Sequence, residues 1–171
     1  MGNQEGLNRG KDFEKVIRDS FEKVPFTLVE RMPDPVQGYL GIRNKCDFIV
    51  YHFPCVYYIE CKSTKSHLLP LSHITFNQRV GMLEASKVIG TVAGIICWFM
   101  SEDKTMFIPI QTIEKYRLND IKSVNLKKLT KEDMKNDGII EIPGKKKRVF
   151  FDYDLEEFIN FCSAEYRGYK L

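Results

Sequence analysis

The chain has 171 residues, of which 43% are hydrophobic and 29% charged, and its formal net charge is +3. These values are those of an ordinary globular protein and predict one compact domain. The longest apolar run, residues 92–100, is about half of the ~20 residues that a membrane-spanning helix needs. We therefore expect no membrane insertion. The sequence also has no G-x-x-x-x-G-K-[ST] segment, so we expect no nucleotide cofactor.

Cysteine usage and the N-terminal residues bear on the compartment. The 5 cysteines form an odd set without a C-x-x-C pair. Such a set indicates reduced thiols that pack as small hydrophobic side chains. The N-terminal residues lack the basic segment and apolar core of a secretory signal. We expect a cytoplasmic protein.

Positive charge is concentrated in the last third of the chain. Between Lys122 and Arg148 there are 9 basic and 4 acidic residues, an excess of about +5 that leaves the remainder near −2. This asymmetry is compatible with nucleic-acid binding and also with a solvated lysine-rich face. The basic run 145–148 is either a phosphate-contacting turn or an exposed hairpin tip.

The first predicted element is an amphipathic helix over residues 11–24. Apolar side chains recur there at three- and four-residue intervals, Asn8 lies near the expected start, and Pro25 stops the helix. Residues 26–30 are expected to form a strand. The segment 31–45 contains prolines, glycines and few apolar residues, which predicts a loop or projection rather than core.

The next elements predict a β-hairpin. Residues 46–51 and 56–62 are apolar, strand-like runs, and the short connection between them fits a tight loop. Residues 63–71 are polar and are expected to be irregular. Thr75 is a suitable N-cap for a helix over 76–88.

A continuous apolar run follows at 92–100, which is typical of a strand covered on both faces. Residues 105–110 are expected to form the strand beside it. This order of elements predicts an α/β domain with a mixed β-sheet flanked by helices. Beyond residue 111 the pattern weakens, and we expect helices over 111–117, 127–135 and 155–162 and strands over 139–142 and 148–152.

Three charged residues stand in the predicted hairpin: Asp47, Glu60 and Lys62. A buried ionised group is destabilising unless it is paired or bound to metal. Alternate side chains of a strand face the same way, so Glu60 and Lys62 share one surface, and Asp47 lies within cross-strand reach. Two carboxylates, a backbone carbonyl and waters form the oxygen shell that Mg²⁺ prefers. The trio therefore predicts metal-assisted hydrolysis of a phosphodiester, with the lysine orienting or deprotonating the attacking water.

The spacing alone is a weak signal. An acidic residue, any residue and then lysine occur four times, as Glu60 to Lys62, Glu102 to Lys104, Asp120 to Lys122 and Asp133 to Lys135. Only the first pair ends an apolar strand. From the residues themselves, an ion pair on an edge strand remains the alternative, and such a pair contributes little to stability.

Several segments together resemble a known family. Asp47, with Glu60-Cys61-Lys62 thirteen residues on, resembles the PD-(D/E)xK nuclease motif. Within that superfamily the chain is similar to the RecU-type Holliday junction resolvases, also called penicillin-binding-protein-related factor A. The matching stretches span residues 8 to about 117 and are Asn8-Arg9-Gly10 with Glu14, Asn44-Lys45-Cys46-Asp47-Phe48, Ile59-Glu60-Cys61-Lys62-Ser63-Thr64, Ile74-Thr75-Phe76-Asn77-Gln78 and Ala93-Gly94-Ile95-Ile96-Cys97-Trp98-Phe99.

The resemblance implies a restriction-endonuclease-like fold with a nuclease core over residues 1–120. Residues 121–171 are expected to be a basic extension packed on the same domain. Asp47, Glu60 and the backbone carbonyl of Cys61 would bind Mg²⁺, for which Mn²⁺ would substitute. Lys62 would be the catalytic lysine, and Gln78 would be the glutamine that this branch adds to the site.

Glu14 would match the N-terminal-helix carboxylate of related resolvases and would orient water or help to hold a second ion. The alternative is a solvated glutamate on an amphipathic helix. The segment 31–45 occupies the place of the family's stalk, although it is shorter and Cys46 replaces an expected hydroxyl residue. Candidate DNA contacts are Arg9, Arg31, Arg43, Lys45 and Lys65.

The resulting hypothesis is a homodimeric, Mg²⁺-dependent DNA endonuclease that resolves four-way junctions by paired symmetric nicks and leaves 5′-phosphate ends. One alternative is a nuclease of the same superfamily that acts on flaps, forks or duplex DNA. A second is a DNA-binding factor that keeps the fold without turnover.

Overall fold

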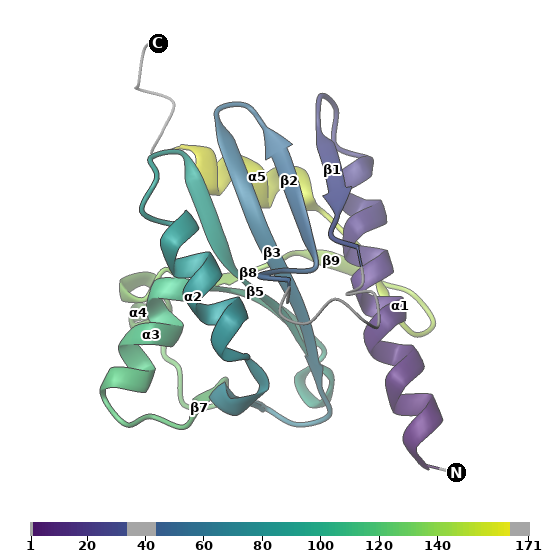
Figure 1. Ribbon diagram of the computed structural model, residues 1–171. Helices are drawn as coiled ribbons and strands as arrows, with labels where there is room; N and C mark the ends of the chain where they lie inside the picture. Colours follow the sequence, from purple (N-terminus) through teal and green to yellow (C-terminus); the bar gives the residue numbers. More distant parts are fainter. Residues whose placement is uncertain (1, 34–43, 165–171) are drawn as a thin grey trace, which may run out of the picture.

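The computed structural model describes residues 2–33 and 44–164, with side chains described from residue 9 onward. Within these residues a six-stranded sheet has the order β1-β2-β3-β5-β6-β8 (Figure 1). β3 and β5 are parallel, and the other neighbours are antiparallel. The strands are β1 (Leu28–Arg31), β2 (Phe48–His52), β3 (Cys55–Thr64), β5 (Thr91–Phe99), β6 (Lys104–Pro109) and β8 (Ile140–Glu141).

Helices cover both faces of the sheet (Figure 1). α1 (Gly2–Glu22) and α5 (Leu155–Ser163) pack on one face, where Phe13, Phe21 and Phe158 are buried. α2 (Phe76–Ala85) and α3 (Ile110–Leu118) pack on the other, with Met82 and Ile113 in the core. The expected α/β class, a mixed sheet flanked by helices as in restriction-endonuclease-like folds, is confirmed by this topology.

β5 lies at the centre of the sheet and is buried from Ala93 to Phe99, as its apolar run predicts. Gly94 allows a close approach there, because a Cβ at that position would lie 2.4 Å from the carbonyl oxygen of Ile108. The parallel pairing of β3 with β5 buries β3 as an interior strand. β3 lies between β2 and β5 as far as Ile59, and from Glu60 to Thr64 its ladder is with β5.

The expected bounds of several early elements were wrong. The first helix begins at Gly2, because its polar first turns extend past the sheet and show no apolar periodicity (Figure 1). The strand expected over 26–30 is β1, which ends at Arg31. The hairpin strands expected over 46–51 and 56–62 are β2 and β3, so Asp47 directly precedes its strand.

Later elements also differ from the expected pattern. The segment 63–71 is not irregular, since β3 continues to Thr64 and is followed by β4 (Leu68–Pro70) and the 3-10 helix η1 (Leu71–His73). β4 pairs with β7 (Ser123–Asn125), a distant partner that no local pattern can reveal. The helix expected over 76–88 ends at Ala85, and β6 and α3 each begin one residue earlier than expected. A second 3-10 helix, η2 (Met100–Glu102), joins β5 to β6.

The C-terminal part adds elements to both layers. The helix expected over 127–135 is reduced to α4 (Lys131–Asn136), and the strand expected over 139–142 is β8. A separate hairpin of β9 (Gly144–Lys146) and β10 (Phe151–Tyr153) replaces the strand expected over 148–152. β8 pairs with β6, and α5 contributes to the main core. Residues 145–148 are exposed around this hairpin.

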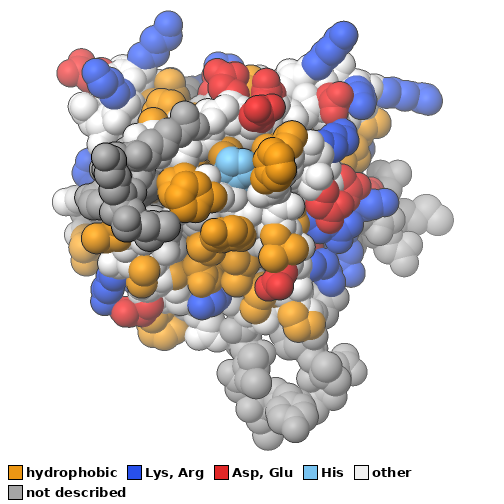
Figure 2. Space-filling model, turned by 90° about the horizontal axis from the view of Figure 1, so that it is seen from above, with side chains coloured by type: hydrophobic (Ala, Val, Ile, Leu, Met, Phe, Trp, Pro, Cys, Tyr) orange, Lys and Arg blue, Asp and Glu red, His pale blue; other side chains and the backbone are white. Residues whose placement is uncertain are grey.

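One end of the sheet exposes large apolar side chains. It is formed by the start of β1, the β2–β3 turn and the connection from α2 to β5, and Figure 2 shows hydrophobic side chains gathered on this face. The backbone N–H of Val56 donates to the carbonyl of Gly90 at 2.8 Å, which joins the last two segments. We name this surface the apolar end; its residues are Phe26, Leu28, Tyr51, Phe53, Val88 and Ile89.

No helix in the described part of the chain combines the length and apolar character needed to cross a bilayer.

Candidate active site

Asp47 is held by backbone contacts on both sides of β2. Its N–H donates to the carbonyl of Ile59 at 3.0 Å, and its own carbonyl accepts from the N–H of Met32 at 2.9 Å. Its carboxylate Oδ2 accepts from the backbone N–H of Cys61 at 2.7 Å. These three contacts fix the Asp47 side chain beside β3.

Glu60 is the most buried charged group of the site, with 2% of its surface exposed. Its Oε1 accepts two short hydrogen bonds, from Nζ of Lys62 and from Nε2 of Gln78, both at 2.6 Å. Its Oε2 is also buried but has no hydrogen-bond partner among the described residues. One oxygen of this carboxylate is therefore saturated with donors, and the other is an acceptor that desolvation would make costly to leave unpaired.

The two carboxyl groups affect each other's protonation. Burial, helped by the nearby charge of Glu60, raises the pKa of Asp47 to about 7. Burial also raises the pKa of Glu60, against the lowering effect of the Lys62 ammonium. The Asp47 side chain acts in the opposite direction and lowers the pKa of Glu60. Two desolvated carboxyls that face each other without a cation favour sharing a proton.

Gln78 reaches the site from the first turn of α2. Thr75 caps this helix, as the sequence predicts, and the cap is reciprocal: Thr75 Oγ1 accepts from the N–H of Gln78, and Gln78 Oε1 accepts from the N–H of Thr75. Gly81 lets the helix lie close to its neighbours, because a Cβ there would come within 2.5 Å of the Lys45 side chain. This accounts for a glycine inside α2.

Glu14 faces the site from α1. Its Oε1 accepts from Nε of Arg31 at 3.1 Å, and 20% of its side chain is exposed. Its charge raises the pKa of both Asp47 and Glu60. The structure therefore brings Glu14 within electrostatic reach of the pair and joins it to β1 through Arg31.

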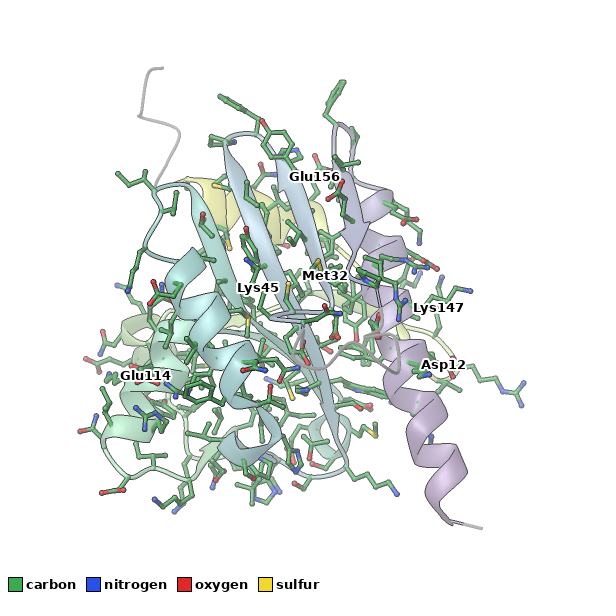
Figure 3. All side chains as sticks on the ribbon, in the orientation of Figure 1. Asp12, Met32, Lys45, Glu114, Lys147 and Glu156 are labelled. Atoms are coloured by element: carbon green, nitrogen blue, oxygen red, sulfur yellow. The ribbon has the colours of Figure 1, made fainter. Side chains whose placement is uncertain are left out.

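The candidate DNA contacts lie in different surroundings. Arg9 and Lys65 are exposed, on α1 and just after β3. Arg31 is paired with Glu14. Lys45 lies beside α2 (Figure 3), with its side chain next to Gly81 and its Nζ 4.7 Å from the centre of the Tyr58 ring on β3. Arg43 and most of the stalk segment 31–45 lie outside the described residues.

The site gathers the residues that the sequence analysis selected from separate segments. Glu60 is bonded to Lys62 and Gln78, Asp47 is bonded to the backbone of the neighbouring Cys61, and the charge of Glu14 acts on Glu60. Sequence reasoning recognised Thr75 as a helix cap but missed its bond to the Gln78 side chain. The T-x-x-Q spacing is the signal that could have revealed it.

The donor set bears on metal binding. In residues 9–33 and 44–164, no group of three or more histidine, cysteine, aspartate and glutamate side chains is arranged to hold a metal ion. Asp47 and Glu60 supply two carboxylates, and the remaining ligands would have to be backbone carbonyls and waters. This composition fits Mg²⁺, which keeps several waters when bound by one or two carboxylates. The orphaned, buried Oε2 of Glu60 fits the same use.

Similarity of this chain to known proteins is found among solved structures. No family model and no curated protein matches the chain. Of the solved structures, 18 chains match. One is Hjc of Archaeoglobus fulgidus, described as a Holliday junction resolvase from an archaeal hyperthermophile, with 17% identity and a TM-score of 0.45. The match covers 60% of this chain and 78% of that protein, and at this level it does not establish a family.

Proposed function

We propose that this protein is a Mg²⁺-dependent DNA endonuclease of the PD-(D/E)xK type that resolves four-way junctions. The observation that carries the proposal is the divided environment of Glu60: Lys62 and Gln78 hold Oε1, whereas Oε2 is buried and has no hydrogen-bond partner in the part of the chain that the structure describes. An ion pair of purely structural use would have no reason to leave one desolvated oxygen unpaired.

The chain's own residues divide the work of hydrolysis. Asp47 and Glu60 Oε2, with the Cys61 carbonyl, would hold the cation. When bound, Mg²⁺ would lower the pKa of a coordinated water and neutralise charge on the scissile phosphate. The Lys62 side chain is 22% exposed and paired with Glu60, and its ammonium would orient the attacking water and stabilise the developing negative charge. Glu14 would orient water from the α1 side.

The preference for junctions rests on the family resemblance. A junction has two strands to be cut, so paired symmetric nicks require two active sites and hence a homodimer. We propose that each nick leaves a 5′-phosphate end. The apolar end supports dimerisation, because exposed apolar patches on monomers are small unless they bind a partner. Phe26 is 97% exposed and has φ of 59°, a conformation that is costly for a bulky residue.

DNA contacts are proposed from side chains around the site. Arg9 and Lys65 are exposed cations, Lys45 lies over the Tyr58 ring, and Arg31 is paired with Glu14. Such contacts to phosphate position DNA and carry no sequence information. The five unpaired cysteines are compatible with a cytoplasmic location.

A panel of substrates tests the proposal. Labelled four-way junction, flap, replication fork and duplex DNA are incubated with the protein in Mg²⁺, and in EDTA as a control. Symmetric nicks in the two opposing strands of the junction, absent in EDTA, are the expected result. Cleavage of flaps, forks or duplex in preference to junctions would favour another nuclease of the same superfamily. Tight binding without any cleavage would favour a DNA-binding factor.

A further inference from the structure

We infer that Thr75 is a positioning residue of this site, acting through Gln78 to determine which oxygen of Glu60 stays open to a cation. The inference rests on the proposed function only in taking that cation to be divalent. It concerns a residue whose hydrogen bonds go to Gln78 and not to the carboxylates.

The first observation is that the Gln78 amide has a fixed orientation. Its Oε1 accepts from the backbone N–H of Thr75 at 2.9 Å, and its own backbone N–H donates to Thr75 Oγ1 at 3.3 Å. The two ends of an amide are nearly equal in shape, so hydrogen bonds alone decide which end points where. With its oxygen bound to Thr75, the amide must turn its NH₂ group towards Glu60.

The second observation is what that NH₂ group does. Nε2 of Gln78 donates to Glu60 Oε1 at 2.6 Å, beside the bond from Lys62 to the same oxygen. A flipped amide would place its oxygen against the carboxylate and its NH₂ against the Thr75 N–H, which removes two hydrogen bonds and adds two repulsive contacts. The cap therefore keeps Oε1 occupied and leaves Oε2 as the open acceptor.

The third observation separates this role from packing. α2 is anchored elsewhere, by the buried Met82 and by the ion pair of Arg79 with Glu114 at 2.7 Å. Thr75 itself is exposed and belongs to neither core cluster. Its hydroxyl accepts from the backbone N–H of Gln78 and so holds the Thr75 backbone against the first turn of α2. Loss of the hydroxyl should displace the Thr75 N–H that binds Gln78 Oε1, which loosens the Gln78 side chain while the helix remains seated.

The test is a double-mutant cycle read by Mn²⁺ binding to the full chain without DNA, measured by electron paramagnetic resonance. We expect Thr75→Val to weaken Mn²⁺ binding on the order of five-fold, a loss that corresponds to the usual cost of removing an N-cap bond. Thr75→Ser keeps the hydroxyl and should bind Mn²⁺ like the parent. Gln78→Met, of similar size but without the amide, should weaken binding at least as much. In the Gln78→Met background, Thr75→Val should add nothing, because its route to Glu60 is gone.

Opposite results overturn the inference. An equal effect of Thr75→Val in both backgrounds would show that it acts by fraying α2, and thermal midpoints measured on all variants would show the same loss. Mn²⁺ binding weakened by Thr75→Ser would show that the hydroxyl is not the group through which Thr75 acts. Mn²⁺ binding that follows the expected cycle in a protein that cuts no DNA would leave this inference standing and remove the proposed nuclease. A parent protein that binds no Mn²⁺ would overturn both.

Discussion

The backbone N–H of Cys61 donates a 2.7 Å hydrogen bond to Oδ2 of Asp47, so the contact between β2 and β3 ends on a side chain rather than on a backbone carbonyl. Asp47 is thereby oriented by the strand that also carries Glu60 and Lys62. The relative position of the two carboxylates depends on the hairpin register, which pairs Phe48 with Ile59. We therefore expect a substitution that changes one charge at the site to leave the remaining side chains in place.

Replacing Glu60 by Gln should lower Mg²⁺-dependent cleavage by about 100-fold or more, because a ligand and the partner of Lys62 are both altered. Lys62→Ala should lower cleavage similarly. DNA binding in EDTA, measured by gel shift, should change little. The matched controls are Glu102→Gln and Lys104→Ala, which have the same spacing outside the site; Glu102 is half-buried and Lys104 is exposed. Parent-like cleavage by Glu60→Gln would exclude the proposed site.

The metal-free protein should lose stability as pH rises from about 4 to about 7. The folded state keeps Asp47 protonated up to a pKa of about 7, whereas in the unfolded chain that carboxyl titrates near 3.8. Between these values the folded state binds more protons, so the free energy of unfolding falls with rising pH. Thermal unfolding in EDTA from pH 4 to 8 measures this slope, and Asp47→Asn should flatten it. Added Mg²⁺ should raise the melting temperature more at pH 8 than at pH 5.

Phe53→Glu should convert a dimer to monomers if the apolar end is the interface, because a charge would be buried against apolar side chains. Sedimentation velocity measures the mass of each species. Leu118→Glu, at an exposed leucine at the end of α3, is the control and should remain dimeric. A Phe53→Glu protein that sediments like a parental dimer would assign the interface to another surface.

Phe158→Ala should cost about 3–5 kcal/mol, because Phe158 is buried and its ring contacts those of Phe21, Tyr57 and Phe107. Urea unfolding should show one transition, as expected if residues 121–171 belong to the same domain. Phe161→Ala, at an exposed position on the same helix, should stay within about 0.5 kcal/mol of the parent. Two separate transitions would show that the extension unfolds independently.

Lys65→Ala should weaken junction binding in EDTA and reduce the slope of log affinity against log salt by about 0.9, the effect of one lost phosphate contact. Lys65 is exposed directly beyond β3. Lys128→Ala, at an exposed lysine near α4, is the control. An unchanged salt slope for Lys65→Ala would show that Lys65 is solvated in the complex.

Local patterns in the sequence determined much of the fold and part of the site. The apolar run of β5, the N-cap at Thr75 and the alternation that places Glu60 and Lys62 on one face all depend on neighbouring residues, so their physics is readable along the chain. The predicted ends of helices and strands were less accurate where polar turns extend an element past its packed part, as in α1.

Tertiary structure alone decided the contacts between segments. The bond of Gln78 to Glu60, the pairing of Glu14 with Arg31 and the strand pair β4–β7 join residues far apart in sequence. Their geometry depends on how helices seat on the sheet and on burial, which also determines the raised pKa of Asp47. A charge pattern names candidates, whereas desolvation and the choice of hydrogen-bond partners arise only when the layers pack.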